Sequence, residues 1–182
     1  MAQGLVDGVR QCPSPNCDER PPGREINLLV IHNISLPPGQ FGGPFIDDLF
    51  LNRLDPAADP YFQNICELRV APHLLIRRDG ELIQYVPLSK RAWHAGQSAF
   101  QGCVSCNDFS IGIELEGTDD LPYTDIQYQM LAQVADAIMR AFPAITAERI
   151  VGHSDIAPGR KTDPGPAFDW SGFKGLLSCV SP

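Results

Sequence analysis

The chain has 182 residues, of which 43% are hydrophobic, and this size and composition predict one domain with its own apolar core. It carries 14 Lys and Arg residues against 22 Asp and Glu residues, which gives a formal charge of -8. Because binding to phosphates depends on clustered cations, this balance argues against a nucleic-acid partner. No segment approaches the roughly 18 consecutive apolar residues that a membrane span needs, and residues 1–10 lack a secretory signal pattern. We therefore expect a soluble, cytoplasmic protein with no membrane partner and no obligate protein partner.

The first 25 residues differ in composition from the rest. Pro13, Pro15, Pro21 and Pro22 interrupt this segment, and residues 13–25 include no large apolar side chain. We expect residues 1–25 to form an extended arm. This arm is expected to pack on a domain that consists of residues 26–182.

Five segments have the apolar, β-branched composition of strands, namely residues 26–31, 73–78, 81–86, 109–116 and 150–151. The first is a dense apolar run, which predicts a strand buried on both faces. The second and third flank Asp79-Gly80, a dipeptide typical of two-residue turns, and are predicted to form a β-hairpin. The fourth alternates, with Gly112, Glu114 and Glu116 on a face that we expect to be free for chemistry. There Glu116 is interpreted as a solvated carboxylate, and the small Gly112 leaves room beside Glu114 for a substrate or metal.

Three segments have helical patterns, namely residues 44–50, 124–142 and 169–177. In the longest, Thr124 and Gln127 have the spacing of a capping box, and apolar residues recur behind them at helical intervals. Strands and helices in this order predict an α/β protein, a single domain with a central mixed β-sheet flanked by α-helices.

Six cysteines occur along the chain, and the compartment decides their state. In a reducing cytosol they are expected to be ordinary free thiols, whereas export would permit disulfides. Cys103 and Cys106 form a lone C-x-x-C, which is only weak evidence for half of a zinc site or a redox pair.

The four histidines show no local zinc motif such as H-E-x-x-H, so any metal site has to be assembled in space. His32 and His153 each follow a short apolar strand, and strand ends hold side chains firmly. Asp163 lies in a proline-stiffened loop after His153. Two imidazoles and a carboxylate leave one tetrahedral position of Zn²⁺ for water, as in catalytic sites, so these three are candidate ligands. The alternative is that each histidine only hydrogen-bonds to backbone.

Five short motifs occur in one order, namely Val30-Ile31-His32-Asn33, Ala92-Trp93-His94-Ala95-Gly96, Gly112-Ile113-Glu114, Gly152-His153 and Lys161-Thr162-Asp163-Pro164-Gly165. Together they resemble the N-acetylmuramoyl-L-alanine amidase family, which includes the peptidoglycan-recognition proteins. More narrowly, residues 32–44, 107–118 and 161–166 resemble its cytoplasmic, anhydro-muramyl branch in Gram-negative bacteria.

The resemblance implies zinc held by His32, His153 and Asp163. The broader family often has cysteine as the third ligand, and aspartate here resembles the cytoplasmic branch. A carboxylate is expected to hold the metal more weakly than a soft thiolate. The resemblance also assigns Glu114 as the general base that later protonates the leaving amine, and Lys161 as the cation that stabilises the oxyanion.

The substrate peptide is anionic while the chain is acidic, so local cations have to offset an unfavourable field. Arg69 and Arg160 are candidates for a peptide carboxylate, Asn33 for peptide backbone and Trp93 for stacking on sugar. His94 is assigned to the substrate cleft or to the support of the ligands. For each of these residues a surface or core role is the alternative.

The expected function is hydrolysis of the amide between the lactyl group of (1,6-anhydro-)N-acetylmuramic acid and L-alanine of muropeptides, in peptidoglycan recycling. By family implication, this activity also lowers the muropeptides that signal β-lactamase induction. Two alternatives stay open, a catalytically silent peptidoglycan-binding module and a secreted wall-remodelling amidase. A complete candidate ligand set argues against the first, and disulfide mapping with intact sacculi would test the second.

Overall fold

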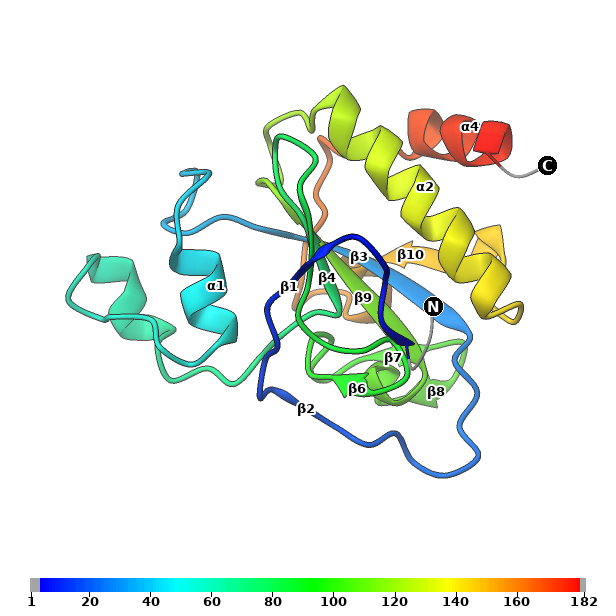
Figure 1. Ribbon diagram of the computed structural model, residues 1–182, viewed down its shortest axis with the longest axis horizontal. Helices are drawn as coiled ribbons and strands as arrows, with labels where there is room; N and C mark the ends of the chain where they lie inside the picture. Colours follow the sequence, from blue (N-terminus) through cyan, green and yellow to red (C-terminus); the bar gives the residue numbers. More distant parts are fainter. Residues whose placement is uncertain (1–3, 181–182) are drawn as a thin grey trace.

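The computed structural model describes residues 4–180 and places six strands in one mixed sheet (Figure 1). The strand order is β1-β5-β4-β9-β3-β10. These strands are β1 (Arg10–Gln11), β3 (Leu28–Ile34), β4 (Leu74–Ile76), β5 (Leu82–Gln84), β9 (Ser110–Glu116) and β10 (Ile150–Gly152). The predicted fold class, a mixed sheet flanked by helices, is confirmed.

Parallel pairing dominates the centre of the sheet. β3 pairs in parallel with β9 on one side and with β10 on the other, and β9 pairs in parallel with β4. The register sets His32 directly opposite Glu114. Because parallel strands end at the same edge of a sheet, the residues at their carboxyl ends gather on one side of the domain.

The predicted β-hairpin is confirmed by the antiparallel pairing of β4 with β5. Gly80 in the connecting turn has a φ of 88°, which L side chains rarely adopt. At the edge beyond β5, the N-terminal segment adds β1 in parallel.

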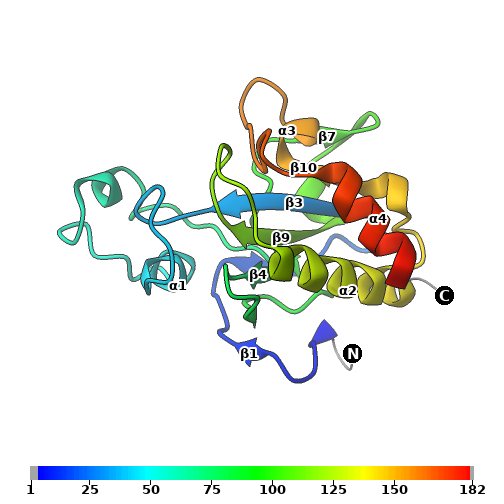
Figure 2. The same ribbon diagram turned by 90° about the horizontal axis from the view of Figure 1, so that it is seen from above.

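Two helices lie side by side over one face of the sheet, α2 (Asp125–Ala141) and α4 (Trp170–Val180) (Figure 2). The predicted capping box begins α2: Gln127 N donates to Thr124 Oγ1 at 3.3 Å, and Thr124 N donates to Gln127 Oε1 at 3.1 Å. The largest apolar cluster lies between sheet and helices and includes Leu29, Ile31, Ile111, Ile113, Leu131 and Phe173. Burial of this cluster fixes the sheet on which the polar residues are mounted.

Shorter elements complete the fold, namely α1 (Phe45–Phe50), η2 (Pro60–Asn64), η3 (Cys106–Asp108), η4 (Ala147–Arg149), α3 (His153–Ile156), and the paired strands β2 (Cys17–Asp18) with β6 (Arg91–Ala92) and β7 (Ala99–Phe100) with β8 (Cys103–Val104). Residues 35–71, which contain α1 and η2, project from one end of the sheet and are called the lobe (Figures 1 and 2). Asn16 ties the arm to the lobe, because its Nδ2 lies 3.1 Å from Phe50 O and 2.9 Å from Val70 O.

β9 differs from the prediction in its second face. Glu116 is 1% exposed, and its carboxylate accepts hydrogen bonds from Arg77 Nη1 at 3.1 Å and from Gly42 N at 2.7 Å. The interpretation of Glu116 as a solvated carboxylate is therefore wrong. Alternation along a strand predicts which face a side chain occupies, but it does not predict that the lobe and Arg77 cover that face.

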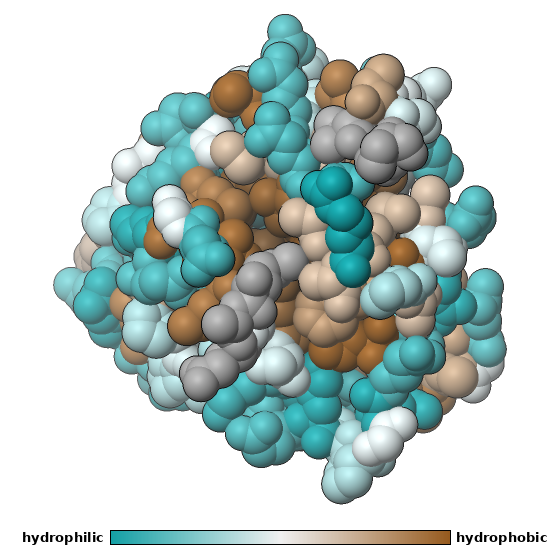
Figure 3. Space-filling view, turned by 45° about the vertical axis from the view of Figure 1, so that its right-hand side comes forward, coloured by the Kyte–Doolittle hydropathy of each residue, from teal (hydrophilic) through white to brown (hydrophobic). Residues whose placement is uncertain are grey.

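All six cysteines lie in the described part of the chain, and none forms a disulfide. Cys103 is exposed and Cys106 is buried. Within residues 4–180, no helix combines the length and apolarity needed to cross a bilayer. Figure 3 shows one face of the molecule, on which hydrophobic side chains gather centrally and hydrophilic ones form the margin.

Candidate active site

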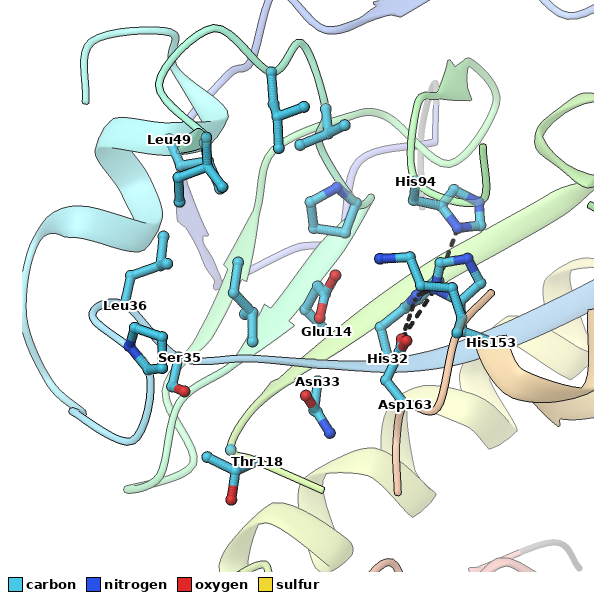
Figure 4. A pocket seen from close by; sticks show the side chains of 18 of the residues that line it. His32, Asn33, Ser35, Leu36, Leu49, His94, Glu114, Thr118, His153 and Asp163 are labelled. Carbon is cyan, nitrogen blue, oxygen red and sulfur yellow. Dashed lines mark hydrogen bonds and ion pairs between the residues drawn. The ribbon is translucent and has the colours of Figure 1, made fainter. Parts of the chain in front are cut away.

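A pocket of about 650 Å³ lies where the carboxyl ends of β3 and β9 meet the lobe (Figure 4). One part of its lining is polar and is called the floor; it consists of His32, His94, Glu114, His153 and Asp163. A second part is mostly apolar, comes from the lobe, and is called the wall; it consists of Leu49, Phe50, Tyr61, Ile65, Leu68 and Val70. Figure 4 shows His32, His94, His153 and Asp163 close together, Glu114 to one side of them, and the lobe residue Leu49 across the pocket.

Three floor side chains converge on one point. The Nδ1 atoms of His32 and His153 are 2.9 Å apart, and Asp163 Oδ2 lies 3.1 Å from the first and 3.0 Å from the second. His32 belongs to β3, His153 begins α3 directly after β10, and Asp163 lies in the loop that follows. The fold thus brings the three predicted ligands within reach of a single ion.

Two hydrogen bonds hold the Asp163 loop in place. Ser154 N donates to the carbonyl of Asp163 at 3.0 Å, and the buried Tyr123 hydroxyl donates to Pro164 O at 2.7 Å. These contacts come from different parts of the chain, so the backbone that carries the Asp163 carboxylate is held from two directions.

The converging atoms fit a divalent metal by their chemistry. Three lone-pair donors directed at one point repel one another unless a cation or a proton lies between them. The outer nitrogens have partners elsewhere, since His32 Nε2 lies 2.9 Å from His94 Nδ1 and His153 Nε2 lies 3.1 Å from Ala95 O. Both Nδ1 atoms are therefore available, and two nitrogens with one carboxylate oxygen match the donor set of catalytic zinc.

Burial sets the charge of these groups. It lowers the pKa of His32 to about 4, so this ring is neutral at pH 7, as metal ligation requires. Burial alone would raise the pKa of Asp163, but hydrogen bonds from His153 and His32 hold that pKa well below its ordinary value.

Glu114 lies on the same floor, and its pKa is shifted in the direction opposite to that of Asp163. Burial raises the pKa of this carboxyl well above its ordinary value, the charge of Asp163 adds to the effect, and Lys161 opposes it. Its Oε2 atom is buried and has no hydrogen-bond partner among residues 4–180. A buried, unpaired carboxyl oxygen beside a metal site is suited to accept and release a proton.

Two predicted residues line the pocket near the cluster. Lys161 is exposed, and its positive charge acts to lower the pKa of both Glu114 and His32. Asn33 donates from Nδ2 to Asp119 Oδ1 at 2.8 Å, which orients its amide and leaves its oxygen as an acceptor.

The space beside Gly112 is used differently from the prediction. A Cβ atom at this position would lie 2.4 Å from Nδ1 of His94 and 2.5 Å from Cγ. The expectation that Gly112 leaves room for substrate or metal is wrong, because the imidazole of His94 packs on the glycine.

The remaining predicted substrate residues are distributed unevenly. Arg160 lines the pocket, but its guanidinium donates to Ala95 O at 2.6 Å and to Gln97 O at 2.7 Å. Arg69 and Trp93 are outside the residues that form the pocket lining; Arg69 donates to the Cys66 carbonyl at 3.3 Å. Their roles in binding stay predictions.

The wall was not predicted from the sequence. Its side chains come from short, irregular elements, so no periodicity marks them. The available signal was the recurrence of large apolar residues in a segment that is otherwise rich in turns, namely Leu49, Tyr61, Ile65 and Leu68.

Two imidazoles and a carboxylate around one point, with a buried carboxyl and a lysine on the same pocket, define a candidate metal-dependent hydrolase. The family model for N-acetylmuramoyl-L-alanine amidase matches residues 22–166. The chain belongs to this family.

The relatives are similar over nearly the whole chain. The 1,6-anhydro-N-acetylmuramyl-L-alanine amidase AmpD of Escherichia coli K12 is 61% identical over 178 residues, 98% of this chain and 97% of the relative. A crystal structure of a selenomethionine AmpD derivative superposes with a TM-score of 0.95 at 59% identity, covering 97% of this chain and 98% of that one. The E. coli amidase AmiD, solved with the substrate anhydro-N-acetylmuramic acid-L-Ala-D-γ-Glu-L-Lys, has a TM-score of 0.60 at 27% identity, covering 98% of this chain and 62% of that one.

Proposed function

We propose that this chain hydrolyses the amide bond between the lactyl group of 1,6-anhydro-N-acetylmuramic acid and L-alanine of muropeptides, in peptidoglycan recycling. The convergence of His32, His153 and Asp163 beside Glu114 carries this proposal. Family membership and the 61% identity to a named anhydro-muramyl amidase support the choice of substrate.

Zn²⁺ is the proposed cofactor, held by Nδ1 of His32, Nδ1 of His153 and Oδ2 of Asp163. When bound, zinc supplies Lewis acidity, which polarises the scissile carbonyl and makes hydroxide available near neutral pH. The rest of the pocket has to place the lactyl carbonyl carbon next to this point.

Glu114 moves the protons of the reaction. In its ionised form, Oε2 accepts a proton from the attacking water, and the resulting acid passes it to the nitrogen of the leaving L-alanine. Lys161 Nζ offsets the negative charge that develops on the carbonyl oxygen. Because Lys161 acts on charge present mainly in the transition state, it should affect turnover more than binding.

Recognition combines the wall with polar groups at the rim. Asn33 Oδ1 accepts from a peptide N–H of the substrate, since its Nδ2 is held by Asp119. The wall covers the apolar parts of the muropeptide, and Arg160 attracts its carboxylates. The proposed binding set also includes Arg69, Trp93 and His94. Of these, His94 lines the pocket, whereas Arg69 and Trp93 lie outside its lining.

We infer a cytoplasmic location and action without an obligate protein partner. Six unpaired thiols agree with a reducing compartment. Consumption of anhydro-muropeptides there would lower the signal for β-lactamase induction.

The test measures zinc content and cleavage of a synthetic anhydro-muramyl tripeptide, with release of the free peptide followed by mass spectrometry. We expect cleavage with zinc, loss on chelation and recovery on adding zinc back. Glu114→Gln should keep the zinc and reduce kcat by about 10²–10⁴. A zinc-loaded chain that binds the muropeptide without cleaving it would instead identify a binding module.

A further inference from the structure

A line of hydrogen bonds leads away from the candidate metal site and starts at Nε2 of His32, the ring nitrogen that faces away from Asp163. His32 Nε2 lies 2.9 Å from His94 Nδ1, and His94 Nε2 lies 3.0 Å from Ser110 Oγ. Figure 4 shows the ring of His94 next to His32, on the side away from Asp163. Ser110 is 0% exposed, so water does not compete for its hydroxyl.

The tautomers along this line follow from the chemistry of the ligand. If His32 binds a metal through Nδ1, its neutral ring carries the proton on Nε2. That N–H needs an acceptor, and the atom facing it is His94 Nδ1. His94 must then carry its own proton on Nε2, from which it donates to Ser110 Oγ.

The neighbouring backbone holds His94 in this position. Gly112 supplies the surface on which the ring lies, since a Cβ there would overlap Nδ1 at 2.4 Å. Arg20, from the arm, donates to Ser110 O at 2.9 Å and to Asn107 O at 3.0 Å, and Asn107 Oδ1 accepts from Ala95 N at 2.8 Å. The backbone at Ser110 and next to His94 is thus held in place.

The second imidazole ligand is supported in a different way. His153 Nε2 faces Ala95 O at 3.1 Å, and a backbone carbonyl can only accept. His32 instead depends on His94 Nδ1, which can accept only in the tautomer that carries the His94 proton on Nε2. Of the two imidazole ligands, His32 is therefore the one whose supporting hydrogen bond a side-chain substitution can remove.

We propose that His94 is a positioning residue, which accepts the Nε2–H of His32, is itself set by Ser110, and so directs the His32 Nδ1 lone pair at the metal. This inference rests on the proposed zinc site. Hydrogen-bond partners behind a metal ligand are typically worth about 10–100-fold in metal affinity, and we expect that range here.

Matched variants separate the acceptor from the bulk of the ring. His94→Asn places its Oδ1 near the position of the lost Nδ1 and keeps an acceptor for His32. His94→Phe keeps a ring but removes the acceptor. Zinc affinity, measured by competition with a chromophoric chelator, should fall about 10–100-fold in His94→Phe and stay within about threefold of wild type in His94→Asn. Equal losses in both variants, or a loss in neither, would overturn the proposal.

A second measurement uses the unaltered chain and does not depend on whether a variant folds. In zinc-loaded protein labelled with ¹⁵N, we expect the proton of His32 on Nε2, the proton of His94 on Nε2, and an unprotonated His94 Nδ1. A proton on His94 Nδ1 would overturn the proposal. If the wild-type chain bound no zinc, the proposed function itself would be contradicted. If wild type and His94→Phe bound zinc equally tightly, only the inference about His94 would be contradicted.

Discussion

The floor and the wall of the pocket are built from different kinds of structure. In the floor, His32 and Glu114 lie on the central strands β3 and β9, and Leu28, Leu29, Val30 and Ile31 before His32 are all 0% exposed. The wall lies on short helical turns of the lobe, with the side chains of Tyr61 and Leu68 at its margin.

This difference matches the two tasks. Ligation and proton transfer require atoms held to within fractions of an ångström, and a buried parallel sheet provides that. Contacts to a large, flexible substrate tolerate looser positioning, and loops supply them on a rigid scaffold. The lobe is nevertheless tied to the rest of the domain, because Nδ2 of Asn16 in the arm donates to the carbonyl oxygens of Phe50 and Val70.

Asp163→Ala should give the largest effect, because it removes a ligand from the floor. We expect loss of zinc on dialysis and a fall in cleavage of at least about 10³-fold, since a metal supplies several kcal/mol of transition-state stabilisation. Metal analysis and kinetics of the purified variant measure both. The control for zinc content is Asp119→Ala, which removes a pocket carboxylate outside the ligand cluster and should keep its zinc. Stoichiometric zinc in Asp163→Ala would contradict the assignment.

Lys161→Ala should come second. Removal of one oxyanion donor costs about 2.7–4 kcal/mol in other enzymes, so kcat should fall about 10²–10³-fold with little change in KM. Lys174→Ala, which removes an exposed lysine of α4, is the matched control and should leave kcat unchanged. A change confined to KM would show that Lys161 binds substrate without stabilising the oxyanion.

Acid should weaken the metal-free fold through the floor and its surroundings. Burial lowers the pKa of His32 to about 4, of His73 to about 3, and of His94 well below its ordinary value. Below about pH 6.5 the unfolded chain binds protons at these histidines that the folded chain does not, so stability falls with pH. Glu114 has a raised pKa and works in the opposite direction, which offsets part of the contribution of the histidines.

The net expectation is a loss of up to about 2–3 kcal/mol for each pH unit between about 6.5 and 5, at about 1.4 kcal/mol for each uncompensated histidine. Urea unfolding in the presence of a chelator at pH 7.5 and at pH 5.5 measures it. Equal or greater stability at pH 5.5 would contradict the assignment of buried neutral imidazoles.

Leu68→Ala should give the smallest effect, because we expect substrate binding by the wall to tolerate the loss of one side chain. Leu68 is 46% exposed, so we expect a loss of about 1 kcal/mol in substrate binding, a rise in KM of about fivefold, and an unchanged kcat. Leu121 is also 46% exposed and lies outside the pocket lining, so Leu121→Ala should leave both constants unchanged. A large fall in kcat for Leu68→Ala would mean that the wall takes part in the chemistry.

Local patterns predicted most of the scaffold. The hairpin at Asp79-Gly80 and the capping box at Thr124 depend on backbone angles and hydrogen bonds between near neighbours, and both are found. The dense apolar run before His32 became a strand buried on both faces, as its composition indicates. Errors came where a distant segment decides the environment, as at Glu116, covered by Arg77, and at Gly112, covered by His94.

By itself, the sequence determined the α/β class, the strand that carries His32, the strand that ends before His153, and the residue types able to hold a metal. Only the tertiary structure decided which nitrogen of each imidazole faces Asp163, that Oε2 of Glu114 is buried with no hydrogen-bond partner among residues 4–180, and that the lobe forms the wall. The physical reason is that composition and periodicity act over a few neighbouring residues. Charge, tautomer and burial depend instead on atoms brought together from positions more than one hundred residues apart, such as His32 and His153.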